Sequence, residues 1–130
     1  MKKYIVLVMA LILLSVVAQA KPMLRGLTAE EFASRQTDLL KRKIELPQEL
    51  INNIGNINLK YANEIYILCD ADKTYPEIKR AFYDLVDRKK LEISNLLPEA
   101  HKDFYSNFED NYKQITWNEI KKYIKKRGVK

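Results

Sequence analysis

Apolar residues recur every three or four positions along most of residues 28–127, the spacing of one face of an α-helix. The chain lacks the sustained apolar and polar alternation of a half-buried strand, and it has no Asn-Gly or Asp-Gly pair typical of hairpin turns. The pattern predicts an all-α protein, a single compact bundle of about five amphipathic helices that follows a cleaved signal peptide.

The first predicted helix runs from Thr28 to about Lys43. Thr28 followed three residues later by Glu31 is a capping box, and Leu27 and Phe32 occupy the two positions of a hydrophobic staple. Both features indicate a helix that begins at this point.

Two helical segments are expected between residues 47 and 70. A short one begins at Pro47, a residue favoured in the first helical turn, and we expect Gly55 and Asn56 to end it. The next one, residues 57–70, carries apolar side chains around most of its circumference and should be the most buried helix.

The C-terminal half predicts three more helical segments. The first covers residues 75–96, with inward positions separated by steps of three and four, and Lys89 fills one of these positions, from which its long side chain can extend to water. The second begins at Pro98, with Phe104, Tyr105, Phe108, Tyr112 and Ile115 inward. A second capping box at residues 116–119 predicts that the last helix starts there and ends near Arg127.

Residues 1–20 have the organisation of a secretory signal peptide. Lys2 and Lys3 precede an unbroken apolar run over residues 4–14, and the segment ends in Ala18-Gln19-Ala20, which fits a cleavage site before Lys21. The apolar stretch is too short for the roughly 20 residues that span a bilayer. We therefore expect a signal peptide at 1–20 and a secreted, extracellular helical domain at 21–130.

Composition excludes several kinds of site. The 130 residues include one cysteine and one histidine, so an intramolecular disulfide framework and a cysteine-based zinc cage are excluded. Cys69 lies in an apolar stretch, where we expect a buried thiol with a raised pKa. His101 is expected at the surface of an amphipathic helix. These residues predict no catalytic site and therefore no enzyme.

Acidic and basic clusters add little specific chemistry. Asp70 and Asp72 suggest a calcium loop, but the positions that need glycine and glutamate hold Tyr75 and Ala81. We expect no metal site and no cofactor. The formal net charge is +6, and removal of residues 1–20 leaves 21 basic and 17 acidic side chains. The basic residues at 121–130 are able to meet an anionic membrane surface, and no nucleic acid partner is expected outside the cell.

The high content of apolar residues suggests a hydrophobic ligand. A secreted helical protein without disulfides can use such side chains to line a pocket for a fatty acid chain, with Lys89 or a tyrosine at the carboxylate. The alternatives are a helical interaction or effector protein with a filled core, and a cationic membrane-surface protein. The candidate lining residues are Ile65, Leu68, Phe82, Leu85, Val86, Ile93, Phe104 and Phe108.

Three motifs in residues 75–104 carry a family resemblance: Tyr75-Pro76-Glu77-Ile78, Phe82-Tyr83-Asp84-Leu85-Val86, and the run from Lys90 to Phe104 that contains Pro98-Glu99-Ala100. This region resembles the nematode fatty acid- and retinol-binding proteins, and Leu46-Pro47-Gln48-Glu49-Leu50 is similar to their Leu-Pro-x-Glu-Val element. The resemblance implies a secreted, all-helical carrier with an internal apolar cavity for fatty acids and retinoids.

Overall fold

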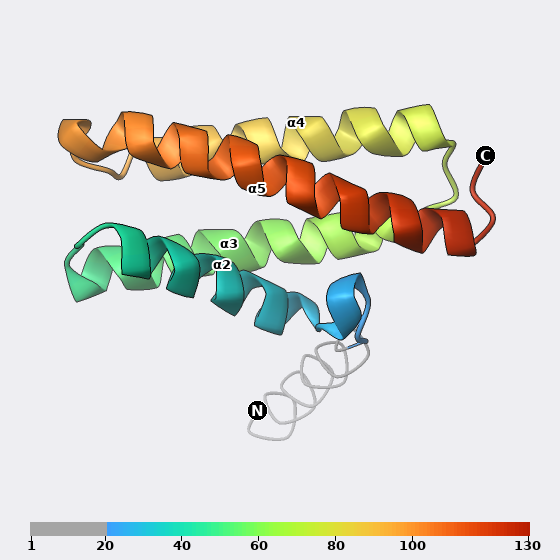
Figure 1. Ribbon diagram of the computed structural model, residues 1–130, viewed down its shortest axis with the longest axis horizontal. Helices are drawn as coiled ribbons and strands as arrows, with labels where there is room; N and C mark the ends of the chain where they lie inside the picture. Colours follow the sequence, from blue (N-terminus) through green and yellow to red (C-terminus); the bar gives the residue numbers. More distant parts are fainter. Residues whose placement is uncertain (1–20) are drawn as a thin grey trace, which may run out of the picture.

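A computed structural model describes residues 21–130, which form an all-α compact bundle of four helices (Figure 1). The signal peptide expected at residues 1–20 lies outside the described residues. A short 3-10 turn, η1, precedes the bundle. The elements are η1 (Leu24–Gly26), α2 (Ala29–Lys43), α3 (Gln48–Cys69), α4 (Tyr75–Ser94) and α5 (Glu99–Lys126).

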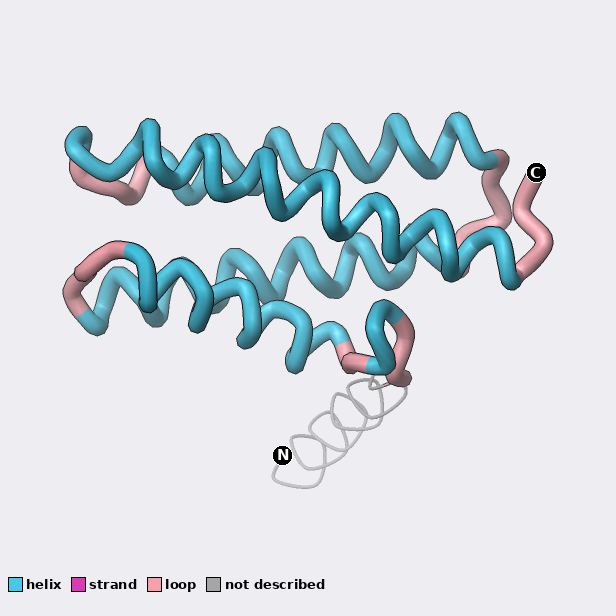
Figure 2. The backbone as a smooth tube through the Cα atoms, viewed as in Figure 1, coloured by secondary structure: helices cyan, strands magenta, loops and turns pink. Residues whose placement is uncertain are grey.

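The four helices form two antiparallel hairpins, α2–α3 and α4–α5, joined by the turn at residues 70–74. Short loops connect them at the two ends of the bundle (Figure 2). α2 packs against α3, α3 against α4, and α4 against α5, whereas η1 covers part of α5. Residue 21 and the C-terminus lie at the same end of the bundle, since Lys21 contacts Tyr123 near the end of α5.

Local chemistry explains where the helices begin and end. The Thr28 capping box is confirmed, because the Glu31 amide donates to Oγ1 of Thr28 at 3.1 Å and Oε1 of Glu31 accepts from the Thr28 amide at 3.1 Å. The sequence analysis did not predict an equivalent capping box, in which Thr74 caps α4. Gly128 has a φ of 83° and follows the last turn of α5, as expected for a residue after a helix end.

Two predicted helix breaks are wrong. α3 continues through Gly55 and Asn56 as one helix of 22 residues, and α5 continues through Thr116 as one helix of 28 residues. In α3 the buried positions follow a helical period on both sides of the glycine, so the packing outweighs the roughly 1 kcal/mol penalty of a glycine. In α5 no proline or glycine ends the helix before Thr116, which is itself buried in the inward stripe.

The core consists of two apolar clusters separated by a polar layer. The larger cluster lies at the end that holds η1, and the smaller one contains Leu40, Ile54, Ile93, Leu97 and Tyr105. Every helix passes from one cluster to the other through a buried polar position. We call this set the central polar layer: Gln36 and Thr37 of α2, Asn58 of α3, Lys89 of α4 and Glu109 of α5.

Candidate functional site

Six of the eight candidate lining residues lie inside the core. Ile65, Leu68, Phe82, Leu85 and Val86 belong to the larger cluster and Ile93 belongs to the smaller one. The structure does not bring these residues together around any of the pockets described below.

The remaining two candidates, Phe104 and Phe108, lie on α5 outside its buried stripe. Phe104 is 41% exposed, and Phe108 is half-buried against the smaller cluster. The inward orientation predicted for Phe104 and Ile115 is wrong, because both side chains are exposed. Tyr105 is buried as predicted, and the buried stripe of α5 continues from it through Glu109.

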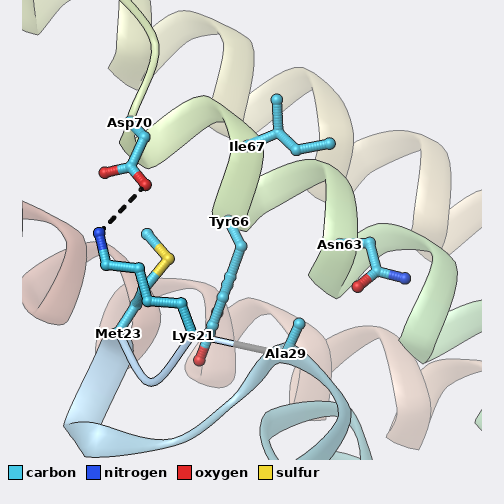
Figure 3. A pocket seen from close by; sticks show the side chains of 7 residues that line it. All are labelled: Lys21, Met23, Ala29, Asn63, Tyr66, Ile67 and Asp70. Atoms are coloured by element: carbon cyan, nitrogen blue, oxygen red, sulfur yellow. Dashed lines mark ion pairs between the residues drawn. The ribbon is translucent and has the colours of Figure 1, made fainter. Parts of the chain in front are cut away.

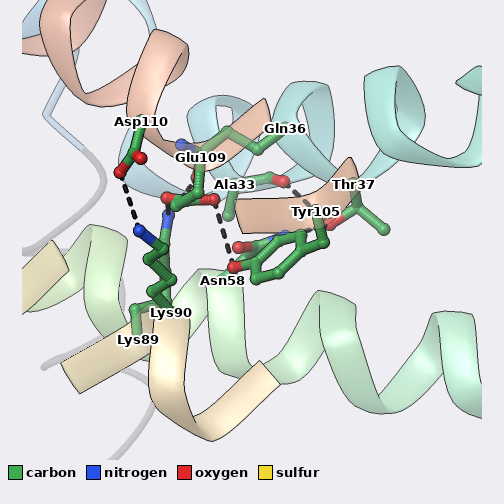
Figure 4. A network of polar contacts seen from close by, with 9 residues as sticks. All are labelled: Ala33, Gln36, Thr37, Asn58, Lys89, Lys90, Tyr105, Glu109 and Asp110. Atoms are coloured by element: carbon green, nitrogen blue, oxygen red, sulfur yellow. Dashed lines mark hydrogen bonds and ion pairs between the residues drawn. The ribbon is translucent and has the colours of Figure 1, made fainter. Parts of the chain in front are cut away.

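Lys89 is also placed differently from the expectation. Its side chain is 2% exposed and does not extend to water. It forms an ion pair with Glu109, and its Nζ lies 3.5 Å from Oε1 of Gln36, an acceptor on α2 (Figure 4). The Tyr105 hydroxyl donates to Oε2 of Glu109 at 3.2 Å. Protein groups thus satisfy the ammonium.

The other half of the central polar layer joins α2 to α3. Asn58 Nδ2 donates to Oγ1 of Thr37 at 2.9 Å, and that hydroxyl donates to the Ala33 carbonyl at 3.0 Å (Figure 4). Satisfied polar groups of this kind favour one register of the helices, because any axial shift would leave them buried without partners.

The bundle is least closed where α2 and α5 face each other. Of the four pairs of adjacent helices in the bundle, α2 and α5 are in the least direct contact. Lys89 of α4 extends across the core to α2 at this point. A groove of about 500 Å³ lies between them. We call it the α2–α5 groove; it is lined by Arg25, Arg35, Asp38, Leu39, Arg42 and Tyr112.

An aromatic ladder continues the α5 wall of the groove. Tyr112 stacks on Phe108 with ring centroids 5.8 Å apart, and Phe108 stacks on Phe104 at 6.4 Å. Phe108 also packs against the smaller core cluster, which includes Leu40 of α2. The ladder spans eight residues of helix, about 12 Å along the axis.

The opposite wall of the groove is cationic. Arg35 and Arg42 form no ion pair with any carboxylate of residues 21–130, and Arg25 is 3.9 Å from Oε1 of Glu119. Burial raises the pKa of the Tyr112 phenol, and the positive charges of Arg25 and Arg35 offset part of that rise. Arg25 and Arg35 line the groove together with Tyr112.

A smaller pocket of about 160 Å³ lies between the N-terminal segment and α3 (Figure 3). Lys21 closes it through an ion pair with Asp70, at an N···O distance of 3.7 Å, and the Tyr123 hydroxyl donates to Asp70 at 2.6 Å. Its volume is below the usual 300–1,000 Å³ of small-molecule sites. These contacts hold residues 21–23 against the bundle.

Neither the cysteine nor the histidine lines the α2–α5 groove. Cys69 is a buried free thiol, as predicted, and burial raises its pKa to about 12. His101 is half-buried near the start of α5. Among the residues that the structure describes, no group of three or more histidine, cysteine, aspartate or glutamate side chains is arranged to hold a metal ion.

Two of the basic residues near the C-terminus contact other groups of the chain. Arg127 Nη2 donates to the Ala71 carbonyl at 2.8 Å, and Lys122 Nζ lies 3.4 Å from Oε1 of Glu119. Lys125 and Lys126 are exposed. No helix within residues 21–130 combines the length and the apolar character needed to cross a bilayer.

Sequence reasoning missed the arginines of the groove. Arg35, Leu39 and Arg42 are spaced by four and three residues, so a helix places them on one face. That spacing was visible in the sequence, but an ordinary solvated helix face has the same pattern. Only the folded structure, in which these side chains line a groove between α2 and α5, shows that they face a hollow.

Neither protein-family models, nor curated proteins, nor solved structures gave a match to this chain. The resemblance to the nematode carriers remains a prediction from the sequence.

Proposed function

We propose that residues 21–130 form a secreted, extracellular and non-enzymatic carrier that binds a fatty acid or a similar hydrophobic ligand. The ligand would lie in the α2–α5 groove. The observation that supports this proposal is that Leu39 of α2 and Tyr112 of α5 line one groove of about 500 Å³, and that Tyr112 begins a stack of aromatic rings that continues along α5 beyond the groove.

The groove is suitable for such a ligand in size and in chemistry. Its volume falls within the 300–1,000 Å³ typical of small-molecule sites. Each methylene that leaves water contributes about 0.8 kcal/mol, so an acyl chain along the aromatic ladder gains affinity without any special motif. Phe104 at 41% exposure supplies apolar surface that a ligand can cover.

The groove is a better candidate than an internal cavity among the residues predicted at first. Phe82 and Ile93 are 0% and 1% exposed and pack against other core residues, so a ligand would have to displace them. Displacing close-packed side chains costs free energy, whereas the groove is already open.

Titration of residues 21–130 with a fluorescent fatty acid tests the proposal. We expect saturable binding that Phe104→Ser weakens about tenfold, because the ligand loses one aromatic contact. Leu91→Ser is a matched control, since Leu91 is an apolar residue 64% exposed on α4 and belongs neither to the groove lining nor to the aromatic ladder. Absence of saturable binding, or equal losses in both variants, would contradict a site in the groove.

A second candidate function is a helical interaction protein with a filled core. The observation that favours it is that six of the eight predicted lining residues are packed among other core residues. In that case the mature chain has no affinity for fatty acids, and native mass spectrometry of the secreted protein shows the apo mass alone.

A further inference from the structure

The two walls of the α2–α5 groove differ in chemistry. On α2, Arg35 and Arg42 flank Leu39, and on α5 the ladder presents only aromatic rings and one hydroxyl. A hydrocarbon alone would have no use for the arginines, because a neutral chain in contact with them would only desolvate their charges. The arrangement fits a molecule that has both an apolar part and a negative charge.

Three arginines line the groove, and two of them lie towards the end that holds η1. Arg25 of η1 and Arg35 in the first half of α2 share the groove with Tyr112, the ladder residue nearest η1, whereas Arg42 lies near the other end of α2. Guanidinium groups donate two parallel hydrogen bonds to a carboxylate, and the phenol adds a second kind of donor. Phe108 and Phe104 extend from this point towards the other end of the bundle.

The backbone at Arg25 gives independent support. Arg25 has a φ of 56°, the left-handed conformation that residues other than glycine, asparagine and aspartate rarely adopt. Strain of this kind occurs often where a side chain must be held at a functional position. Here it holds an arginine at the border of the groove, where the side chain also reaches Glu119.

We propose that the α2–α5 groove selects amphiphiles with an acidic headgroup over neutral ones, and that it binds them in one direction. The headgroup contacts Arg25, Arg35 and the Tyr112 hydroxyl, and the apolar tail lies along Phe108 and Phe104. This inference rests on the proposed carrier function and specifies its ligand class: a long-chain acid is accepted, and an alcohol of the same length is bound weakly.

Two carboxylates weaken the attraction of the groove for an acidic headgroup, and one of them provides a test. Asp38 lies in the groove between the arginines of α2, and Glu119 partly neutralises Arg25. Removing the charge of Asp38 with Asp38→Asn should tighten the binding of an acid about threefold to tenfold, because one repulsive charge at the site is lost. A gain of affinity is not expected from a variant that merely disturbs the fold.

The experiment measures displacement of a fluorescent fatty acid by dodecanoate and by dodecanol. We expect dodecanoate to bind at least tenfold more tightly. Arg35→Gln should bring dodecanoate to the level of dodecanol and leave dodecanol unchanged. Arg88→Gln is the control, because Arg88 is an exposed arginine that pairs with Asp84 on α4.

The outcomes separate the two proposals. Equal affinity for the two compounds, with Phe104→Ser weakening both, would leave the carrier function in place and overturn the headgroup site. Equal loss of both compounds in Arg35→Gln, or no gain for the acid in Asp38→Asn, would also overturn it. If neither compound binds, both proposals fail.

Discussion

Replacing Lys89 by methionine should be among the most damaging single changes to the fold. The methionine fills similar space, but Glu109 is 3% exposed and would lose its ion-pair partner. Removing one member of a buried ion pair costs about 3–5 kcal/mol, a large part of the total stability of a domain of this size. We expect a fall in melting temperature of about 12–20 °C.

A double-mutant cycle shows whether the ion pair itself is responsible. Glu109→Gln alone should also cost about 3–5 kcal/mol, since it leaves the Lys89 ammonium buried and unpaired. The double variant keeps an acceptor for the Tyr105 hydroxyl and contains no buried charge at either position. It should recover at least half of the summed loss of about 6–10 kcal/mol, which appears as a coupling energy of about 3 kcal/mol or more.

Lys90 is the matched control for this cycle. It neighbours Lys89 and pairs with Asp110 at 2.8 Å, but its side chain is 26% exposed. Lys90→Met should cost about 1 kcal/mol or less. Urea unfolding followed by circular dichroism measures all four variants. A loss below about 1 kcal/mol for Lys89→Met, or strictly additive losses in the cycle, would refute the reasoning.

Three further predictions concern other parts of the bundle. Gly55→Ala should stabilise the chain by about 0.5–1 kcal/mol in thermal unfolding, because a Cβ there meets Thr37 only at 3.8 Å, an ordinary contact; destabilisation would mean that α3 lies closer to α2. Cys69 should resist a thiol reagent at pH 8 until urea unfolds the chain, since its pKa is about 12 and it is buried; fast native labelling would show that the larger cluster opens. Hydrogen bonds from Thr74 lower the pKa of the Glu77 carboxyl below 4.5 in the folded chain. The stabilisation that they provide is therefore complete above that pH and is lost as the pH falls through the pKa of the folded chain. The urea midpoint of Glu77→Gln should depend less on pH, between about 5 and 3, than that of the unchanged chain, and identical pH profiles would contradict this.

The sequence carried most of the information about helix type and helix starts. Thr28 with Glu31 located the start of α2 because a capping box is local chemistry. The predicted breaks at Gly55 and Thr116 failed for a non-local reason. A helix continues through a weak position when buried neighbours on both sides pack in one period, and the partners in that packing come from other helices.

The candidate site was harder to predict for a related reason. Periodicity shows which residues face inward, but it does not show how closely the opposing helices approach. Ile65 and Phe82 have apolar side chains of the kind that line a hydrophobic pocket, but in the structure they are packed core residues. Arg35 and Arg42 had the spacing of a solvated face and line a groove, because α2 and α5 stay apart at that point.

The central claim is that a hydrophobic acid binds in the α2–α5 groove. The most direct measurement is a set of intermolecular NOEs between ¹³C-labelled dodecanoate and residues 21–130. We expect contacts from the methylene groups to the rings of Phe104, Phe108 and Tyr112 and to the Leu39 methyl groups. Contacts to Ile65, Leu85 or Val86 would place the ligand inside the core and would contradict a groove site.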